Sequence, residues 1–418
     1  MSSFCAIDFG TTNSAVAVPG LSGMKLAEIE PGYRSLPTAV FYNAENNTRC
    51  FGRDAVAAYV DGLDGRLMRS IKSILGSDLM DRETEIGPNV AVRYIDVVVG
   101  FLRHLKEVAE AREQVELEHV ILGRPVYFVD DDARRDAQAQ DALEFAARAV
   151  GFKSVAFQFE PIAAALEFEA QVERERLVLV VDAGGGTTDF SVVRVGPSRR
   201  EALDRRDDIL ANHGVHLAGT DFDQALSRKC IMPLLGMGAL GPDGRQVPSS
   251  IYFDLSTWHL INTCYAVNRV VELQRMKWFY NEHVYHRRLM HVLRHRYGHE
   301  LAAKTEDAKI KVGHHGTAII DLHAVEPGLQ LALGVVDLSE ALGEKMERIS
   351  QEAVTAVRMA NLRAQDLDVL YFTGGSTKLE FLTRRIAGLF PTAQVVFGDP
   401  FASVVSGLGI YASRLFRS

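Results

Sequence analysis

Two stretches of the chain share one order of apolar and polar positions. In each, an apolar run ends in an aspartate, a short turn of glycine and hydroxyl residues follows, and a second apolar run begins. The two stretches are residues 6–16 and 180–192. Apolar runs of this length, continuous or alternating, predict strands. Each stretch is therefore expected to form a β-hairpin with a Gly/Thr turn at its tip.

The composition of these turns points to phosphate. A Gly/Thr turn can wrap a phosphate with its backbone N–H groups, and an aspartate beside it can hold the accompanying metal ion. Commoner phosphate loops run through glycines into a helix, whereas these turns lead into strands. A single copy could be an ordinary hairpin turn. Two copies 174 positions apart (Asp182 minus Asp8) predict two similar domains that face one nucleotide.

The rest of the chain alternates predicted strands and helices. Helical periodicity, capping acids and terminal glycines predict helices at residues 54–61, 95–111, 130–150, 162–170, 220–235, 301–312, 338–360 and 404–415. The third of these is expected to start with the acidic run Asp130, Asp131 and Asp132, one of which can cap it. Short apolar runs predict strands at residues 119–122, 155–159 and 369–373. Strands and helices that alternate in both halves indicate an α/β fold throughout. The charged turn at residues 174–177 is the best candidate for a boundary between two domains.

Composition narrows the class of protein. The 418 residues are 47% hydrophobic with a net charge of −8, which indicates a soluble protein without general affinity for nucleic acid or anionic membranes. No apolar run is long enough to span a bilayer, and no secretory signal begins the chain. The four cysteines are scattered, so reduced thiols of a cytoplasmic protein are expected, with a disulfide or zinc site as the alternative.

Eight segments, in order along the chain, resemble the nucleotide-binding domain of DnaK-type heat-shock chaperones, within the actin, hexokinase and heat-shock ATPase superfamily. They are residues 7–14, 71–76, 125–128, 159–166, 182–189, 216–223, 306–311 and 373–376. The chain resembles most closely the short YegD-like members, because it stops at Ser418, where the family's peptide-binding domain would start.

The resemblance implies a two-lobed, actin-like ATPase fold with the nucleotide in the cleft between the lobes. Each lobe is a mixed sheet with flanking helices and a smaller inserted subdomain. The expected boundaries are 1–175 for lobe I, with an insert at about 40–115, and 176–418 for lobe II, with a helical insert at about 229–309.

The resemblance also implies the site, which would bind ATP or ADP with Mg²⁺ and, as a further candidate, K⁺. Asp8 and Asp182 would hold the metal. The residues expected to perform or orient hydrolysis are Lys72, Glu160, Asp182 and Thr187. Those expected to hold phosphate are Gly10, Thr11, Thr12, Asn13, Gly184, Gly185, Gly186 and Thr188. Those expected around the adenosine are Gly219, Glu306, Lys309, Gly313, Gly374, Gly375, Ser376 and Lys378.

Several of these residues also have a plainer interpretation. Lys72 lies in an Arg/Lys-rich stretch and could be a solvated lysine. Glu160 could be a first-turn acid that the helix dipole favours. Glu306 and Lys309 could form a surface ion pair of little energetic value. Asp8 and Asp182 are harder to explain away, because an unpaired charge at the end of an apolar strand is costly.

The chain also departs from the family pattern. Phe159 replaces an asparagine used in J-protein docking, which puts that partnership in doubt. Around the purine, Lys378 replaces an arginine, Gly313 a serine and Phe401 an aspartate. Lysine and arginine are not equivalent in stacking, so base recognition is expected to be altered while the phosphate chemistry is retained.

Residues 236–300 align poorly with the family and are basic and aromatic. His291, His295 and His299 recur every four residues, so they are expected to share one solvated helix face, with a metal site as the alternative. The insert could be a docking surface for a protein partner. Aromatic and basic residues also suit single-stranded nucleic acid, which we rank lower because the apolar residues must build a core.

The leading hypothesis is a slow, chaperone-type ATPase switch that works on or with a partner protein. One alternative is a polymerising, actin-like structural ATPase, which would share the phosphate hairpins. Another is a small-molecule kinase on the same fold, although no motif offers a base aimed at a substrate hydroxyl.

Overall fold

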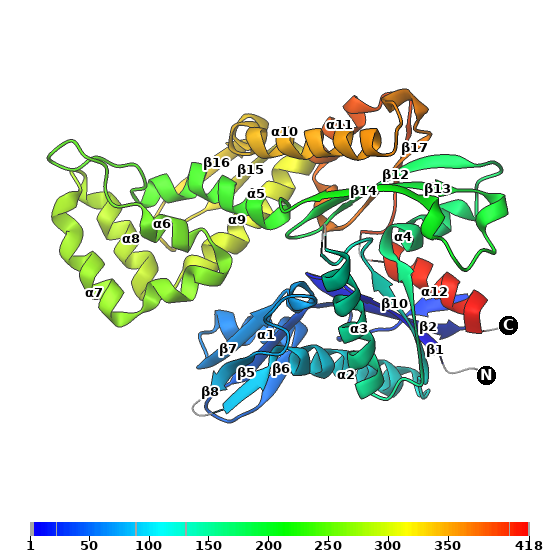
Figure 1. Cartoon of the computed structure of the whole chain (residues 1–418). Coiled ribbons are helices and arrows are strands. Elements are labelled where there is room, and N and C mark those ends of the chain that lie inside the picture. Colours follow the sequence, from blue (N-terminus) through cyan, green and yellow to red (C-terminus); the bar gives the residue numbers. More distant parts are fainter. Residues whose placement is uncertain (1–3, 22, 88–89, 130–131, 401, 417–418) are drawn as a thin grey trace. The chain divides into compact units, whose positions relative to one another are not determined.

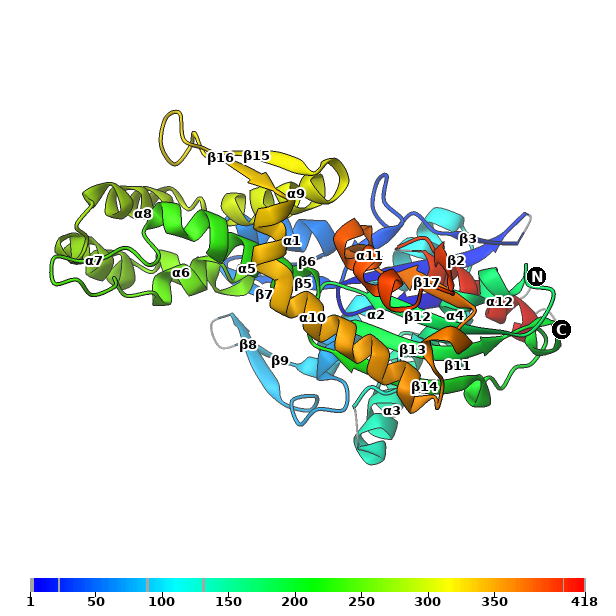
Figure 2. The same cartoon turned by 90° about the horizontal axis from the view of Figure 1, so that it is seen from above.

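The structure is a computed structural model of the chain that describes residues 4–21, 23–87, 90–129, 132–400 and 402–416 (Figures 1 and 2). The chain divides into two compact units. Unit 1 comprises Met1–His216, Glu352–Thr377 and Ile386–Ser418, and unit 2 comprises Leu217–Gln351 and Lys378–Arg385.

The first large sheet of unit 1 is built around the first predicted hairpin. Strand β1 (Phe4–Phe9) pairs antiparallel with β2 (Asn13–Gly20), and parallel with β10 (His119–Arg124). Strand β11 (Ser154–Phe159) pairs parallel with β10. The order is β11-β10-β1-β2-β3, with β3 at Gly23–Leu26 and β4 (Ser35–Pro37) also paired to β2.

The second large sheet of unit 1 contains the second predicted hairpin. Strands β12 (Arg176–Ala183) and β13 (Thr188–Val195) pair antiparallel, and β12 pairs parallel with β17 (Val369–Thr373). The order is β14-β13-β12-β17-β18, with β14 at Ile209–Val215 and β18 at Gln394–Phe397. Both hairpins are thus confirmed, as is the α/β character of the chain.

Alternation along β1 sends side chains to two different cores. Cys5, Ile7 and Phe9 pack in a cluster with α2 (Tyr94–Glu113) and α3 (Ala133–Ala149). Phe4 and Ala6 pack in another cluster with α4 (Glu160–Glu169) and α12 (Ser403–Phe416). That second cluster also includes apolar residues of β12, β13 and β17, so α4 and α12 lie between the two large sheets (Figure 1).

Helices α4 and α12 meet backbone to backbone. A Cβ built on Gly407 of α12 would lie 1.8 Å from the carbonyl oxygen of Ala163 in α4. No real side chain tolerates that separation, so only glycine permits this contact. The predicted cap of α3 is also present, because the carboxylate of Asp132 accepts a hydrogen bond from the backbone N–H of Arg135 at 3.0 Å. Asp130 and Asp131, predicted to precede it, lie outside the described residues.

A smaller part of unit 1 follows β4. Strands β5 (Ala39–Asn43), β6 (Arg49–Phe51) and β7 (Gly65–Arg69) form a sheet in the order β6-β5-β7, and α1 (Gly52–Val60) packs on it. A 3₁₀ turn at Ile71–Ile74 comes next, followed by a hairpin of β8 (Glu83–Gly87) and β9 (Val90–Arg93).

Unit 2 is mainly helical. Its helices include α5 (Gly219–Leu226), α6 (Ser250–Leu255), α7 (Val267–Arg275), α8 (His283–His295) and α9 (Gly298–His315). A hairpin of β15 (Thr317–Asp321) and β16 (Gln330–Gly334) packs on α9. Helices α10 (Val335–Met359) and α11 (Glu380–Leu389) begin in unit 2 and end in unit 1.

Two predictions in unit 2 are wrong in detail. The helix predicted at 220–235 stays α-helical only to Leu226 and continues as π and 3₁₀ turns, the last of which contains Pro233, a residue without a backbone N–H. His299 does not share a face with His291 and His295, because Arg296 takes a left-handed φ of 56° and ends α8. His299 begins α9 instead and is buried, with 6% of its surface exposed.

Among the described residues, no helix is both long and apolar enough to cross a membrane.

Candidate functional site

The first turn, residues 10–13, is tightly closed. A Cβ on Gly10 would lie 2.2 Å from the carbonyl oxygen of Asn13, so only glycine fits there. Thr38 secures the turn from outside. Its hydroxyl donates to the carbonyl of Gly10 at 2.7 Å, and its N–H donates to the carbonyl of Thr12 at 2.8 Å. The hydroxyl-bearing side chains of Thr11 and Thr12 are half-buried at the tip.

The second turn, residues 184–187, has a different set of supports. The N–H of Gly184 donates to the carbonyl of Thr187 at 2.9 Å, and the Thr187 hydroxyl donates to Asp189 at 2.9 Å. The Ser376 hydroxyl donates to the carbonyl of Gly184 at 2.5 Å. Thr188 is completely buried, so only its backbone borders the turn.

The two turns meet at their tips within unit 1. A Cβ on Gly185 would lie 2.8 Å from the hydroxyl oxygen of Thr12, so the side chain of the first turn fills the space that the glycine leaves in the second. Gly374, just after β17, packs closely against Asp182 and Ala183, which lead into the second turn. It has a φ of 86°, and a Cβ there would lie 2.5 Å from a carboxylate oxygen of Asp182.

Asp8 and Asp182 are half-buried at the ends of β1 and β12. No hydrogen bond or ion pair engages either carboxylate within the part of the chain that the structure describes. Burial, followed by the charge of Glu160, raises the pKa of Asp8 to about 7, against the opposing effect of Lys72. Burial, followed by the charges of Asp189, Glu160 and Asp8, raises the pKa of Asp182 to about 8.

These two carboxylates fit a cation. Their charges are poorly solvated and repel each other, so a cation between them would be favourable. No group of three or more His, Cys, Asp or Glu side chains gathers as a metal site among the described residues. Two carboxylates are a ligand set that can hold Mg²⁺, which keeps several water ligands and is usually bound through one or two carboxylates and the substrate phosphates.

Lys72 and Glu160 form a direct ion pair, with 2.5 Å between Nζ and Oε1. Lys72 lies on the 3₁₀ turn after β7 and is 8% exposed, so it is not a solvated lysine. Burial lowers its pKa, but Glu160, Asp8 and Asp182 outweigh this effect and leave the pKa raised above its usual value. Glu160 is the first residue of α4, with Pro161 next to it. Lys72 is therefore a buried cation that pairs with Glu160 and interacts electrostatically with Asp8 and Asp182.

Other predicted site residues belong to unit 2. Lys309 of α9 pairs with Asp223 at 2.7 Å and points its Nζ at the carbonyl of Gly219 at 3.4 Å. Glu306, one turn before Lys309, is exposed. A Cβ on Gly313 would lie 3.0 Å from a methyl of Leu379. The unit thus brings Gly219 and Lys309 together and leaves Glu306 open to solvent.

The last two residues that the sequence predicts near the purine are Lys378 and Phe401. Lys378 follows the 374–376 turn and is exposed. Phe401 lies outside the described residues. Gly375, between Gly374 and Ser376, begins a 3₁₀ turn.

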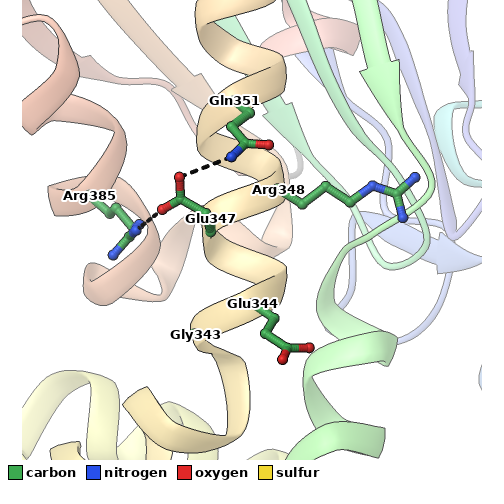
Figure 3. A pocket seen from close by; sticks show the side chains of 6 residues that line it. All are labelled: Gly343, Glu344, Glu347, Arg348, Gln351 and Arg385. Atoms are coloured by element: carbon green, nitrogen blue, oxygen red, sulfur yellow. Dashed lines mark hydrogen bonds and ion pairs between the residues drawn. The ribbon is translucent and has the colours of Figure 1, made fainter.

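A shallow groove is present in unit 2. It runs along α10 and is lined by Gly343, Glu344, Glu347, Arg348, Gln351 and Arg385 (Figure 3). Glu347 binds both Arg385 and Gln351, while Glu344 and Arg348 point away from that cluster. None of the predicted site residues lines it.

Sequence reasoning missed three supporting residues. Thr38 holds the first turn, Asp189 holds Thr187, and Asp223 holds Lys309. Asp189 and Asp223 fall inside segments that carried the family resemblance, so the resemblance could have pointed to them. Thr38 has no such signal.

Comparison with known families matches residues 4–233 to the family described as Hsp70 protein. The matched residues are more than half of the chain. The chain belongs to the Hsp70 family. The predicted DnaK-type nucleotide-binding domain and its mixed α/β fold are thereby confirmed.

The Hsp70-family chain is 32% identical over 242 residues to the Chaperone protein HscA homolog of Shewanella denitrificans, covering 53% of the chain and 36% of that relative. It is 25% identical over 382 residues to Chaperone protein DnaK of Mesomycoplasma hyopneumoniae, covering 89% of the chain and 52% of that relative. The chain therefore spans about a third to about half of the length of these relatives.

Proposed function

We propose that this Hsp70-family chain binds ATP with Mg²⁺ and hydrolyses it slowly, as a chaperone-type switch that a partner protein reads. One observation carries the proposal. The buried Lys72–Glu160 pair lies in the electrostatic range of Asp8 and Asp182, which end the strands leading into the two turns and which no described residue engages in a hydrogen bond or ion pair.

Each side chain has a role in this proposal. Backbone N–H groups and hydroxyls of the two turns hold the β- and γ-phosphates. Lys72 supplies a fixed positive charge where negative charge develops on the transferred group. Glu160 and Thr187 orient the attacking water, and Glu160 or Asp182 accepts its proton.

Asp8 and Asp182 would hold Mg²⁺. When bound, Mg²⁺ would neutralise phosphate charge. Gly374, Gly375 and Ser376 in unit 1, with Gly219, Glu306, Lys309, Gly313 and Lys378 in unit 2, are proposed to surround the adenosine. K⁺ as a second ion, the likeness to the short YegD-like members, the two-lobe boundaries and a cytoplasmic location stay predictions.

The partner is proposed to dock on the helical insert at about 229–309, and nucleic acid and membranes are not expected to compete. This proposal rests on the basic and aromatic character of the insert in an otherwise acidic chain. Neither a polymerising ATPase nor a small-molecule kinase gains a supporting observation from the described residues.

Isothermal titration calorimetry with ATP, ADP and GTP, with and without Mg²⁺, tests the binding step. We expect ATP and ADP to bind in a Mg²⁺-dependent manner. The affinity for ATP should exceed that for GTP only modestly, because the residues predicted around the purine depart from the family pattern. No heat with any nucleotide would contradict the proposal.

Single-turnover hydrolysis of [γ-³²P]ATP tests the chemical step. Lys72→Ala should lower the rate by about 100-fold or more while ATP binding is retained. Lys153→Ala, which removes an exposed lysine paired with Glu118, serves as the control and should leave the rate unchanged. Equal rates in both variants would remove Lys72 from the mechanism.

A further inference from the structure

Helix α7 and the 3₁₀ turn that follows it (Met276–Phe279) carry apolar side chains toward solvent. Val267 is 80% exposed, Val271 43%, Trp278 72% and Phe279 54%. We call these four residues the α7 stripe. No residue of α7 is buried, which is unusual for a helix containing four apolar residues in nine.

The α7 stripe spans the helix and the turn after it. Val267 and Val271, four positions apart, fall on the same side of α7, and Trp278 and Phe279 follow in the 3₁₀ turn. A second apolar row, Val270, Leu273 and Met276, is half-buried and serves the packing of unit 2. The stripe is therefore apolar surface that this packing does not use.

A neighbouring loop widens this surface. Leu240 is 51% exposed, and its carbonyl accepts a hydrogen bond from the N–H of Asn281 at 3.1 Å, two residues after Phe279. Both views place α7 at the end of unit 2 opposite α10 (Figures 1 and 2). Exposed apolar surface rimmed by polar residues marks an interaction site.

The segment that carries the α7 stripe is rich in basic residues. Residues 267–296 contain seven Lys or Arg and two Asp or Glu. Three of the seven, Arg269, Arg287 and Arg288, pair with Asp254 or Glu326 outside the segment. Among the described residues no ion pair engages Arg275, Lys277, Arg294 or Arg296. Lys277 instead lies over the ring of Trp278, 5.4 Å from its centroid. An occupant with carboxylates would neutralise these charges.

We propose that the α7 stripe docks an amphipathic helix of a partner protein whose apolar side is flanked by Asp and Glu. This rests on the partner role proposed for the helical insert and names the chemistry of that partner. Helices that dock this way are anchored at positions i, i+4 and i+7, and an exposed tryptophan is the residue type that most often dominates such contacts.

Two other occupants fit less well. Single-stranded nucleic acid binds by stacking successive bases on aromatic rings, but two of the four stripe residues are valines, which offer no ring. A second copy docked on the same surface would bring two positive regions together.

The test uses two synthetic helical peptides of about four turns. Both carry leucines at i, i+4, i+7 and i+11. One has glutamates beside the leucines, and the other has lysines. Trp258→Phe leaves Trp278 as the one tryptophan of the two in the chain, so its emission reports coverage of the stripe. Calorimetry on the unmodified chain repeats the measurement in case that variant folds poorly.

We expect the acidic peptide to shift Trp278 emission to the blue and to bind at least about tenfold more tightly than the basic peptide. Val271→Asp and Trp278→Ala should each weaken binding by about tenfold. Ile319→Asp, a change at an aliphatic residue that is 68% exposed on β15, is the matched control and should have no effect.

Equal binding of the two peptides, or unchanged binding in Trp278→Ala, would overturn the proposal. So would a doubling of mass with concentration, which assigns the stripe to a second copy, or preferential binding of a single-stranded oligonucleotide. ATP calorimetry on the same variants separates the two proposals, because normal ATP binding without peptide binding refutes the docking surface alone.

Discussion

The first turn, residues 10–13, and the second, residues 184–187, each follow the last paired residues of an antiparallel hairpin, Phe9 with Ser14 and Ala183 with Thr188. Their backbones match in length, but their side chains do not. The first turn has two threonines at its tip, whereas the second has three glycines before Thr187.

The carboxylates behind the turns differ as well. Asp8 lies opposite Ala15 in its ladder, whereas Asp182 lies opposite Asp189. The second hairpin therefore has one more negative charge, and the same residue Asp189 holds the Thr187 hydroxyl. The two hairpins thus share a backbone pattern and differ in their side chains. Under the proposed function, the first turn would serve binding and the second would position the reactive water.

The largest expected effect tests this division of roles between the two turns. Thr187→Ala should lower single-turnover ATP hydrolysis by about 100-fold and leave the Kd for ATP nearly unchanged, because it removes a group that orients water. Thr11→Ala, at the tip of the first turn, should instead weaken ATP binding more than it slows turnover. The reverse pattern in the two variants would contradict the division of roles.

Stability should also distinguish the turns. Gly10→Ala forces a Cβ to within 2.2 Å of a backbone oxygen and should lower the free energy of unfolding by about 1–3 kcal/mol. An added Cβ on Gly186 meets nothing within 4 Å, so Gly186→Ala should change it by less than about 0.5 kcal/mol. Urea denaturation measures both, and similar losses would mean that the two turns are equally confined.

The contact between the tips can be tested with a double-mutant cycle. Gly185→Ala should cost about 1 kcal/mol of stability, because the new methyl lies 2.8 Å from the Thr12 hydroxyl. With Thr12→Ala in the same chain, about 0.5 kcal/mol or more should be recovered. Strict additivity of the two changes would show that the tips do not touch in solution.

The smallest effect concerns the extra charge of the second hairpin. The pKa of Asp182 is raised, so the folded protein keeps a proton that the unfolded chain releases near pH 4. The stability of the metal-free protein should therefore fall as pH rises from about 4 to about 8. Asp189→Asn removes one cause of the raised pKa and should lessen this fall.

At pH 8, Asp189→Asn should raise the free energy of unfolding by less than about 1 kcal/mol, since Asp189 is exposed and its charge is screened. Urea denaturation in a chelating buffer at pH 4, 6 and 8 measures it. At pH 4 the variant and the unchanged protein should differ little. A variant that is less stable at pH 8 would show that Asp189 supports the hairpin chiefly through Thr187.

Local patterns predicted the hairpins well. The apolar runs around Asp8 and Asp182 fix strand pairing, and the cap at Asp132 fixes the start of α3, because both depend on neighbours in sequence. Lys72 could be placed only by family resemblance, since its own surroundings in the sequence are basic. Its partner Glu160 lies 88 positions away in the sequence.

Contacts between distant hydroxyls could not be predicted. Thr38 and Ser376 support the two turns through single hydrogen bonds that leave no periodic trace. His299 was misplaced for another reason: one residue, Arg296, with a left-handed φ ends a helix that periodicity alone would continue. Glycine usually marks such a break, and here arginine takes the conformation.

The close contact at Gly407 joins α12 to the helix that carries Glu160. Side chains between two helices normally absorb small displacements by changing rotamer, but no side chain separates α12 from α4 at Ala163. A displacement of α12 would therefore reach α4 directly at Ala163, three residues beyond Glu160. Glu160 pairs with Lys72, so we expect such a displacement to shift the charged pair.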